Sequence, residues 1–139
     1  MIRYVIDSSA LWRVLRDPTV NAGWQDILSD GVIGSCHPQR REFCRSARSV
    51  EDYERMQAMF DSLHPDVPLP KAVWRWVEAA QYRLARTGIH RALSTVDLLL
   101  CGAAVQHGLV LLHDDRDLHA AAGRLDGLSE RRILDLPGG

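Results

Sequence analysis

The chain has 139 residues, of which 46% are hydrophobic, and its formal net charge is −1. This length fits one domain with a substantial core, and the hydrophobic content argues against a disordered chain. The near-neutral charge excludes a general attraction to nucleic acid, so any such contact requires a local basic patch. Arginine supplies sixteen of the seventeen basic residues. Its bidentate phosphate contacts are compatible with RNA binding, although we favour codon bias in a GC-rich genome as the main cause.

The cysteines and the apolar runs indicate the expected environment. Cys36, Cys44 and Cys101 have no CxxC spacing and are odd in number, so we expect reduced thiols. No apolar run approaches the roughly 18–20 residues that a membrane span needs. Residues 1–3 lead directly into a strand-like run, without a signal peptide. We therefore expect a cytoplasmic protein without membrane contact, in which residues 1–139 form one domain with a loose end at 136–139.

Strand and helix patterns alternate along the chain. Short apolar runs bounded by turn residues indicate buried strands, and apolar residues three and four apart indicate helices. In chain order we expect a strand at 2–6, helices at 10–16 and 20–28, a strand at 32–34, helices at 38–48 and 50–63, a short edge strand near 67, helices at 70–86 and 95–106, a strand at 109–112, a helix at 115–125 and a weak strand at 132–134. This order predicts an α/β fold of three layers (α/β/α) with a mostly parallel, twisted sheet of four to five strands.

Four acidic residues occupy positions that a metal-dependent nuclease would need. Asp7 ends the first apolar run, and Asp115 closely follows the run at 109–112. Asp97 opens an apolar helix, and Glu42 lies among arginines in another helix. Because the carboxyl ends of parallel strands meet at one edge of a sheet, the fold can bring these residues together. Gathered carboxylates repel one another unless a hard cation binds, and an oxygen-rich cluster suits Mg²⁺ or Mn²⁺.

Each acid also has a purely structural explanation. Asp7 can cap the following helix, and Asp97 lies three residues after Ser94 in a pattern that resembles a capping box. Glu42 can pair with a neighbouring arginine on a solvated helix. The acids of the segment 114–117 can be solvated turn residues that the helix dipole favours. Taken together the structural explanations are weaker, because two of the acids follow the most apolar strands.

Four segments resemble the PIN-domain ribonucleases and, more narrowly, the VapC toxins of bacterial toxin–antitoxin pairs. Each motif is weak alone, but all four occur in the family's order and span essentially the whole chain. One departure is His113, which stands where the family often has threonine or serine two residues before its fourth acid. The four segments are Ile6-Asp7-Ser8-Ser9-Ala10-Leu11, Arg41-Glu42-Phe43 with Ser46-Ala47-Arg48, Ser94-Thr95-Val96-Asp97-Leu98-Leu99, and Leu111-Leu112-His113-Asp114-Asp115-Arg116-Asp117-Leu118.

The resemblance implies a role for each acid. Asp7, Asp97 and Asp115 correspond to the family's metal ligands, with Asp117 as an accessory, and Glu42 to the residue that holds or activates the attacking water. The implied cofactor is Mg²⁺, for which Mn²⁺ can substitute. Hydrolysis would leave a 5′-phosphate and a 3′-hydroxyl. Ser8 or Ser9 can add a hydroxyl or backbone contact at the start of the helix.

The resemblance also implies biological partners. It predicts an endoribonuclease toxin that cleaves RNA, with tRNA favoured, and thereby inhibits translation and growth. It implies a homodimer and a VapB-like antitoxin, with DNA contacted only indirectly through that antitoxin. Two alternatives remain at this point: a catalytically inactive PIN-like binding module and a housekeeping RNA-processing nuclease.

Two groups of basic residues are candidates for RNA contact. Arg41, Arg45 and Arg48 would share one face of the helix predicted at 38–48. A second group precedes the Asp97 helix and consists of Arg86, His90 and Arg91. A solvated helix face neutralised by acids explains the first group equally well.

The helix at 50–63 carries an aromatic and methionine-rich face. Its residues Tyr53, Met56, Met59 and Phe60 are candidates for antitoxin contact, because such surfaces adapt to a docking helix. Burial in the domain's own core is the alternative for part of this face. The six histidines show no zinc-ligand spacing, so we expect no zinc site from them.

Overall fold

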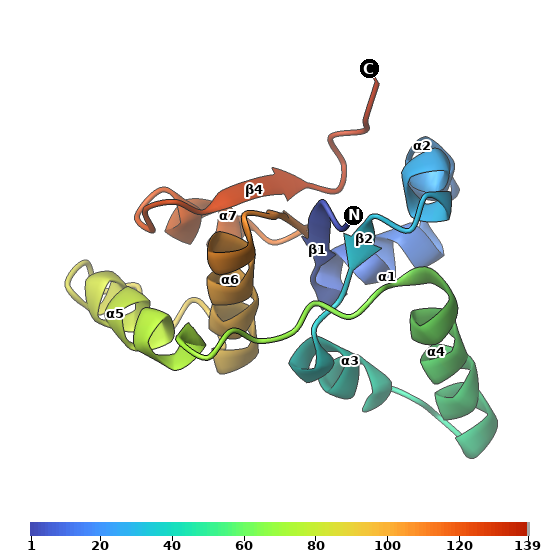
Figure 1. Ribbon diagram of the computed structural model, residues 1–139, viewed down its shortest axis with the longest axis horizontal. Helices are drawn as coiled ribbons and strands as arrows, with labels where there is room; N and C mark the ends of the chain where they lie inside the picture. The colour runs from blue at the N-terminus through green and yellow to red at the C-terminus, as the bar shows by residue number, and fades with distance from the viewer. Residues whose placement is uncertain (139) are drawn as a thin grey trace.

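The computed structural model describes residues 1–138, which form four strands and seven helices (Figure 1). Within these residues no helix is both long enough and apolar enough to cross a bilayer. The elements are β1 (Tyr4–Ile6), α1 (Ser8–Arg16), α2 (Pro18–Ser29), β2 (Ile33–Gly34), α3 (His37–Cys44), α4 (Val50–Leu63), α5 (Val73–Ala85), α6 (Thr95–His107), β3 (Val110–His113), α7 (Arg116–Ala122) and β4 (Ser129–Arg132).

The four strands form one parallel sheet in the order β2-β1-β3-β4. In the central pair, Ile6 of β1 lies opposite Leu112 of β3. The backbone N–H of Asp7 then donates to the carbonyl of Leu112 at 3.0 Å. The two strands therefore end at the same level, and the residues that follow them emerge side by side.

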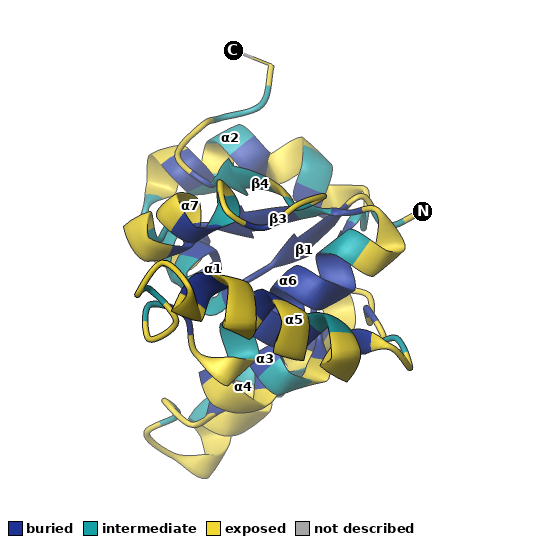
Figure 2. Cartoon of the chain, turned by 90° about the vertical axis from the view of Figure 1, so that its left-hand side faces the viewer, coloured by how far each residue is buried: buried dark blue, intermediate teal, exposed yellow. Residues whose placement is uncertain are grey.

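Alternate strand residues face opposite helical layers. Val5 and Leu111 pack with α5, α6 and α7, whereas Ile6 and Leu112 pack with α1, α2 and residues of α3 and α4. In Figure 1, α5 and α6 lie on one side of the sheet and α1 and α2 on the other. Figure 2 shows β1 and β3 buried between these layers. The predicted α/β/α fold with a parallel sheet is confirmed.

Most element predictions hold, and the differences have local causes. The helix expected to begin at Pro70 begins at Val73, after a turn in which the N–H of Val73 donates to the carbonyl of Pro70. The helix expected at 38–48 ends at Cys44, where the Ser46 hydroxyl binds the Phe43 carbonyl and competes with the helical bond. The expected strand near 67 is a single parallel bridge between Ser35 and Asp66.

The last strand differs most from its prediction. It pairs with β3 over residues 129–132 rather than 132–134, although the N–H of Ile133 still donates to the carbonyl of His113 at 2.7 Å. Its sequence is Ser-Glu-Arg-Arg, which carries no apolar alternation. The sheet thus has a charged strand at one edge. At the other edge, β2 has two residues and its continuation is covered by the bridge to Asp66.

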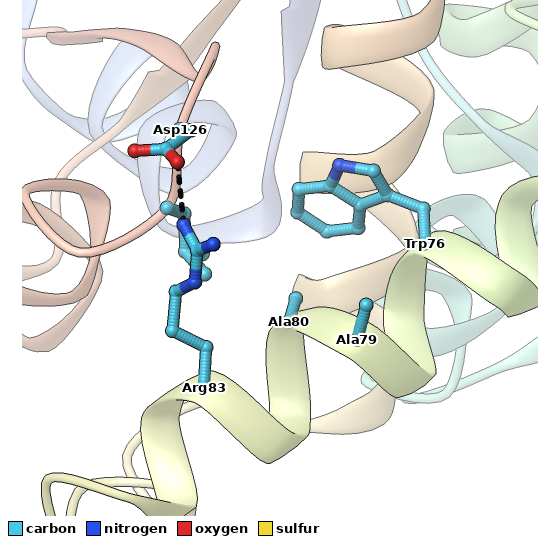
Figure 3. A pocket seen from close by; sticks show the side chains of 6 residues that line it. Trp76, Ala79, Ala80, Arg83 and Asp126 are labelled. Carbon is cyan, nitrogen blue, oxygen red and sulfur yellow. Dashed lines mark hydrogen bonds and ion pairs between the residues drawn. The ribbon is translucent and has the colours of Figure 1, made fainter.

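The α5–α6 pair depends on a glycine. A Cβ atom on Gly102 of α6 would come within 3.0 Å of the side chains of Trp76 and Val73 on α5. Beyond Trp76, α5 is joined to the loop after α7 by the ion pair of Arg83 with Asp126 at 2.7 Å (Figure 3). The shallow pocket between them lies away from the ends of β1 and β3 and includes none of the predicted acids.

Trp24 is the largest fully buried side chain. Its indole Nε1–H donates to the carbonyl of Ile133 at 2.8 Å, and its ring packs edge-on against Tyr4. It therefore joins α2 to the central strand and to the end of β4. Trp74 on α5 is 55% exposed and provides a matched comparison.

We predict that Trp24→Ala lowers the free energy of unfolding by about 3–5 kcal/mol, because it leaves a cavity and an unpaired carbonyl. Trp74→Ala should change it by less than about 0.5 kcal/mol, since little buried area is lost. Urea unfolding followed by circular dichroism measures both values. Equal destabilisation by the two variants would contradict this assignment of the core.

Candidate active site

Asp7 is a buried carboxylate at the end of the central strand. It is 3% exposed, and one oxygen accepts the N–H of Ala10 at 2.8 Å, which caps α1. The Ser9 hydroxyl lies 2.7 and 2.9 Å from its two oxygens. Burial raises the pKa of Asp7 to about 6, and the negative charge of Asp97 adds to this effect, while the hydrogen bonds oppose it. The carboxylate is thus held in an unfavourable environment.

Asp97 lies in the first turn of α6 and forms a true capping box. Its Oδ2 accepts the N–H of Ser94 at 3.1 Å, and its own N–H donates to the Ser94 hydroxyl at 3.1 Å. Burial raises the pKa of Asp97, and the charge of Asp115 raises it further. The structural explanation of Asp97 as part of a capping box is therefore confirmed.

Glu42 reaches the same region from α3. Its side chain is exposed, yet partial burial of the carboxylate and then the charge of Asp97 raise its pKa. The helix is fixed two residues earlier by Arg40, which is buried. Arg40 donates to the Ser35 hydroxyl at 2.6 Å and to the His64 carbonyl at 2.8 Å. Sequence analysis did not single out Arg40, because nothing in its pattern distinguishes it from the neighbouring arginines.

Asp115 and Asp114 follow β3 but have different surroundings. Asp115 caps α7, because its Oδ1 accepts the N–H groups of Asp117 at 2.8 Å and of Leu118 at 3.4 Å. Asp114 accepts from both Nε and an Nη atom of Arg13, at 3.0 and 2.9 Å. Asp114 is thus neutralised by an ion pair. Asp117 is exposed in the first turn of α7.

Asp97 is the centre of a group that we call the acid cluster, comprising Asp7, Glu42, Asp97 and Asp115. Its charge disfavours ionisation of Asp7 and of Glu42, and the charge of Asp115 disfavours its own. The four acids therefore lie near enough to affect one another's ionisation, although within residues 1–138 no three of them have ligand oxygens within 4.8 Å of one another, and their metal-binding role stays a prediction. A divalent cation would relieve their repulsion, and four carboxylates are the oxygen donors that Mg²⁺ and Mn²⁺ prefer.

Two polar residues tie the cluster to its scaffold. The Ser9 hydroxyl, besides donating to Asp7, accepts the N–H of Asp114 at 2.8 Å and so joins the ends of β1 and β3. Gln39 is fully buried and donates to the Ser8 hydroxyl at 3.2 Å. Within residues 1–138 the Gln39 carbonyl oxygen has no hydrogen-bond partner. Gln39 was missed because a glutamine in a polar helix gives no sequence signal of burial.

His113 is fully buried beside the cluster. Its Nδ1 accepts the backbone N–H of Asp115 at 3.1 Å, so the ring proton lies on Nε2. That Nε2–H donates to Glu130 on β4 at 2.5 Å. The residue that departs from the family pattern therefore fixes the backbone from which Asp115 projects.

The predicted RNA-contact residues are dispersed. Arg41 is engaged with α4, where it donates to the Tyr53 hydroxyl at 2.6 Å and to Gln57 at 2.5 Å. Arg45 caps the end of α3, and Arg48 lies beyond the helix, so the predicted shared face of Arg41, Arg45 and Arg48 is wrong. The second group is exposed at the end of α5 and in the loop before α6, and it comprises Arg86, His90 and Arg91.

A basic groove that sequence analysis missed leads toward the acid cluster. Two adjoining hollows share Trp12 and Arg16, and the Arg16 guanidinium lies over the Trp12 ring at 4.1 Å. We call this surface the arginine groove. Within residues 1–138, Arg16 and Arg48 form no ion pair. The groove is lined by Ser9, Trp12, Arg13, Arg16, Asp17, Pro18, Ser46, Arg48, Ser49, Asp52, Arg55, Met56 and Asp114.

The predicted antitoxin face of α4 is only partly available. Phe60 is fully buried against Phe43, so its prediction as a contact residue is wrong. Met56 and Met59 are half-buried, whereas Tyr53 is 40% exposed. The domain's own core therefore takes one end of this face and leaves the Tyr53 end open.

No family model matches the chain. Among curated proteins, Ribonuclease VapC6 of Mycobacterium tuberculosis is 53% identical over 103 residues, covering 74% of this chain and 81% of VapC6. Ribonuclease VapC21 of the same organism is 30% identical over 120 residues, covering 86% of each chain. The chain belongs to the VapC family of ribonucleases. It is accordingly an endoribonuclease of the toxin type, and VapC nucleases in general depend on a metal ion.

A solved structure shows the same fold. The DNA-bound VapBC structure from Salmonella typhimurium matches with a TM-score of 0.73 at 16% identity, covering 96% of this chain and 99% of that chain. At this identity the likeness concerns the fold alone. It agrees with the PIN-domain architecture that the four sequence motifs predict.

The burial of Asp7 yields a pH-dependent prediction. Its folded pKa of about 6 exceeds the ordinary value of 3.8, so the folded state prefers the protonated acid. The cost of ionising Asp7 is absent below pH 4, grows between pH 4 and 6, and is complete at neutral pH. Asp7→Asn, which can still cap α1, should therefore stabilise the metal-free protein at pH 7.5 by up to about 3 kcal/mol. The gain should vanish near pH 3.5.

Thermal unfolding in the presence of EDTA across this pH range measures the difference. Asp126→Asn is the control, since Asp126 is an exposed acid far from the cluster. A stabilisation by Asp7→Asn that does not change with pH would contradict the proposed cost of ionisation.

Proposed function

We propose that the acid cluster is the Mg²⁺ site at which this toxin hydrolyses RNA. The observation that carries the proposal is that Asp7, Glu42 and Asp97 all have raised pKa values, caused first by burial and then by the charge of a neighbouring acid, which is Asp97 for Asp7 and Glu42 and Asp115 for Asp97. The helix caps that Asp7, Asp97 and Asp115 form need only an acceptor oxygen, which a neutral serine or asparagine also supplies, so capping does not require the gathered negative charge. A cation-dependent reaction on a phosphodiester does require it.

Each residue has a proposed task. Asp7, Asp97 and Asp115 hold the ion, and Asp117 is an accessory acid at the rim. The capping hydrogen bonds use Oδ2 of Asp97 and Oδ1 of Asp115, so the other carboxylate oxygen of each residue accepts no capping hydrogen bond. When bound, Mg²⁺ supplies Lewis acidity and neutralises phosphate charge, and Mn²⁺ can substitute.

Glu42 is the proposed base. Its raised pKa makes it a better proton acceptor at neutral pH than an ordinary glutamate, and its exposed position admits a water molecule. Glu42 orients this water and takes its proton during attack on the phosphorus. The bond from phosphorus to the 3′ oxygen breaks, the leaving oxygen takes a proton from solvent to become a hydroxyl, and the new fragment carries a 5′-phosphate.

RNA is proposed to approach along the arginine groove. Arg16 and Arg48 offer phosphate contacts, and Trp12 offers a ring on which a base or guanidinium can stack. The groove reaches Ser9 and Asp114, which adjoin Asp7 and Asp115. The exposed group of Arg86, His90 and Arg91 lies before the start of α6 and extends the contact. A structured RNA such as tRNA would span both basic regions.

We predict that Asp97→Asn reduces RNA cleavage by at least about 1000-fold, since it removes the charge at the centre of the cluster. The capping box should persist, because asparagine also accepts the Ser94 N–H, and the fold should be retained. Cleavage of total tRNA with and without Mg²⁺, followed by end sequencing, measures the effect. Asp126→Asn serves as the matched surface control and should keep full activity.

The wild-type chain and Asp97→Asn together also test the toxin role in cells. Expression of the wild-type chain should arrest bacterial growth, and Asp97→Asn should relieve the arrest. Full cleavage by purified Asp97→Asn would refute the proposed metal site. Normal growth of cells that contain soluble, active wild-type protein would contradict the toxin role and leave the nuclease role in place.

The arginine groove gives a second test. Arg16→Ala combined with Arg48→Ala should weaken RNA binding and reduce the slope of log affinity against log salt by about 0.7 for each lost phosphate contact on single-stranded RNA. Arg83→Ala is the control, because Arg83 pairs with Asp126 away from the groove. Fluorescence anisotropy with inactive Asp97→Asn protein measures binding without cleavage. An unchanged slope would exclude the groove from the RNA path.

We propose a VapB-like antitoxin as the protein partner and a homodimer as the assembly. Relatives of this fold have been solved as VapBC complexes, and the Salmonella typhimurium complex carries DNA. The open end of the α4 face, with Tyr53 and Met56, suits an amphipathic helix. An arginine beyond that helix would be attracted to the acid cluster and could replace the charge of the metal ion. DNA is contacted only through the antitoxin.

Met56 also lines the arginine groove, so a helix on α4 would cover the RNA path. We predict that an amphipathic peptide with a downstream arginine inhibits cleavage, and that replacing this arginine with alanine weakens inhibition. Tyr53→Ala in the toxin should raise the inhibition constant by about tenfold, as expected of an aromatic anchor. Trp74→Ala provides the exposed aromatic control. Equal inhibition of both variants would exclude the α4 face as the docking site.

A further inference from the structure

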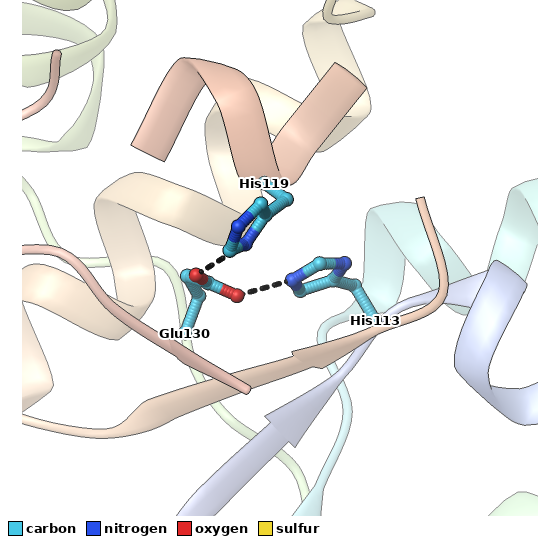
Figure 4. A group of neighbouring side chains, drawn as sticks. All are labelled: His113, His119 and Glu130. Atoms are coloured by element: carbon cyan, nitrogen blue, oxygen red, sulfur yellow. Dashed lines mark hydrogen bonds and ion pairs between the residues drawn. The ribbon is translucent and has the colours of Figure 1, made fainter. Parts of the chain in front are cut away.

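Three potential metal ligands meet outside the acid cluster. His113 at the end of β3, His119 on α7 and Glu130 on β4 have ligand atoms that all lie within 4.8 Å of one another. Figure 4 shows the Glu130 carboxylate between the two imidazole rings. Its Oε2 lies 2.5 Å from His113 Nε2, and its Oε1 lies 2.9 Å from His119 Nδ1. The sequence spacing of the histidines gave no zinc signature, and it could not reveal this group, because strand pairing joins residues that are distant in the chain.

The chemistry of this group differs from that of the acid cluster. Two imidazole nitrogens and one carboxylate are a donor set that suits Zn²⁺, whereas an all-carboxylate cluster suits Mg²⁺. Three protein ligands leave a fourth tetrahedral position for water. A shallow hollow along α7 and β4, lined by His119 and Glu130 among others, opens the group to solvent. His113 is fully buried at its inner end, and His119 is exposed at its outer end.

We propose that His113, His119 and Glu130 form a second metal site, selective for Zn²⁺, whose occupation inhibits the nuclease. The inhibitory part rests on the proposed function of Asp115 as a ligand in the acid cluster. The binding part stands on the three residues alone.

The coupling follows from the tautomer of His113. Its Nδ1 accepts the N–H of Asp115, and its proton is on Nε2, the atom that faces Glu130. Coordination through Nε2 requires the ring proton to move, by way of solvent, from Nε2 to Nδ1. Nδ1–H would then face the N–H of Asp115, and the hydrogen bond between them is lost. Zinc binding therefore releases the backbone that positions Asp115.

The same argument predicts a reciprocal effect. An ion in the acid cluster that holds Asp115 in place favours the Nδ1-acceptor form of His113 and so weakens zinc binding. Zn²⁺ at the second site and Mg²⁺ in the acid cluster should accordingly weaken each other's binding without excluding it, because the two ions occupy distinct sites. The signature of this effect is dependence on the His119 side chain, which is not part of the acid cluster; the backbone N–H of His119 donates to the carbonyl of Asp115 at 3.1 Å, and this bond is kept in His119→Ala.

The binding test uses Zn²⁺ alone in competition with a chromophoric chelator at pH 7.5. Asp97→Asn protein should bind one Zn²⁺ with saturation, because the second site is intact in this variant. His119→Ala in the same background should lower the affinity for Zn²⁺ by more than about tenfold. Loss of a residue that only hydrogen-bonds to a metal ligand already lowers metal affinity by ~10–100-fold, and His119 is a proposed ligand itself. Cobalt substitution should give the intense visible absorption of a four-coordinate ion. Equal affinity with and without His119 would overturn the site.

The activity test adds Zn²⁺ to the wild-type protein at saturating Mg²⁺. Wild type should lose activity, and His119→Ala should keep its basal activity and resist Zn²⁺ over the same range. Inhibition of both proteins alike would place zinc in the acid cluster and overturn the coupling. Failure of the proposed function would appear instead as full cleavage by Asp97→Asn, an outcome that leaves the binding test valid.

Discussion

The parallel pairing of β1 with β3 is the constraint on which the rest of the structure depends. Because Ile6 lies opposite Leu112, the two strands end together and the residues after them share one edge. A slip of one residue would turn Ile6 and Leu112 toward the wrong helical layer, so hydrophobic packing enforces the register. The same register sets Asp7 beside His113 and lets Ser9 bridge to Asp114. Packing far from the site thus determines the separation of its acids.

The acids of the site also begin helices, and this dual use limits what the cluster costs the fold. Asp7 and Asp115 cap α1 and α7, and Asp97 completes the capping box of α6 by accepting the N–H of the cap residue Ser94, so each gains hydrogen bonds from backbone N–H groups that need partners. These bonds and the helix dipoles favour the ionised acids, while burial and mutual repulsion oppose ionisation. For Asp7 the opposing effects win, and its pKa rises. The fold therefore tolerates the cluster but holds it in a state that a cation would improve.

The positions of Asp7, Asp97 and Asp115 at the ends of buried elements could be predicted from the sequence, because each stands next to an apolar run whose burial is easily recognised, while their role as metal ligands stays a prediction. The sequence predicted β4 poorly, since a charged edge strand has no apolar alternation, and its pairing is decided by β3. The burial of Phe60 depends on its contact with Phe43, which is seventeen positions away and on another helix. The groove around Trp12 and Arg16 is likewise a product of tertiary packing. Spacing along one element can locate an acid, but it cannot locate a surface that several elements share.

Both edges of the sheet have consequences for recognition. The β2 edge is short and is covered by the segment around Asp66, and the β4 edge carries Glu130, Arg131 and Arg132. Such edges disfavour β-augmentation, in which a foreign strand extends a sheet through backbone hydrogen bonds that any sequence can make. A partner must instead read side chains on helices and loops. Selectivity among related toxins and their partners would then reside in surface residues, which can diverge from one pair to the next while the sheet stays unchanged.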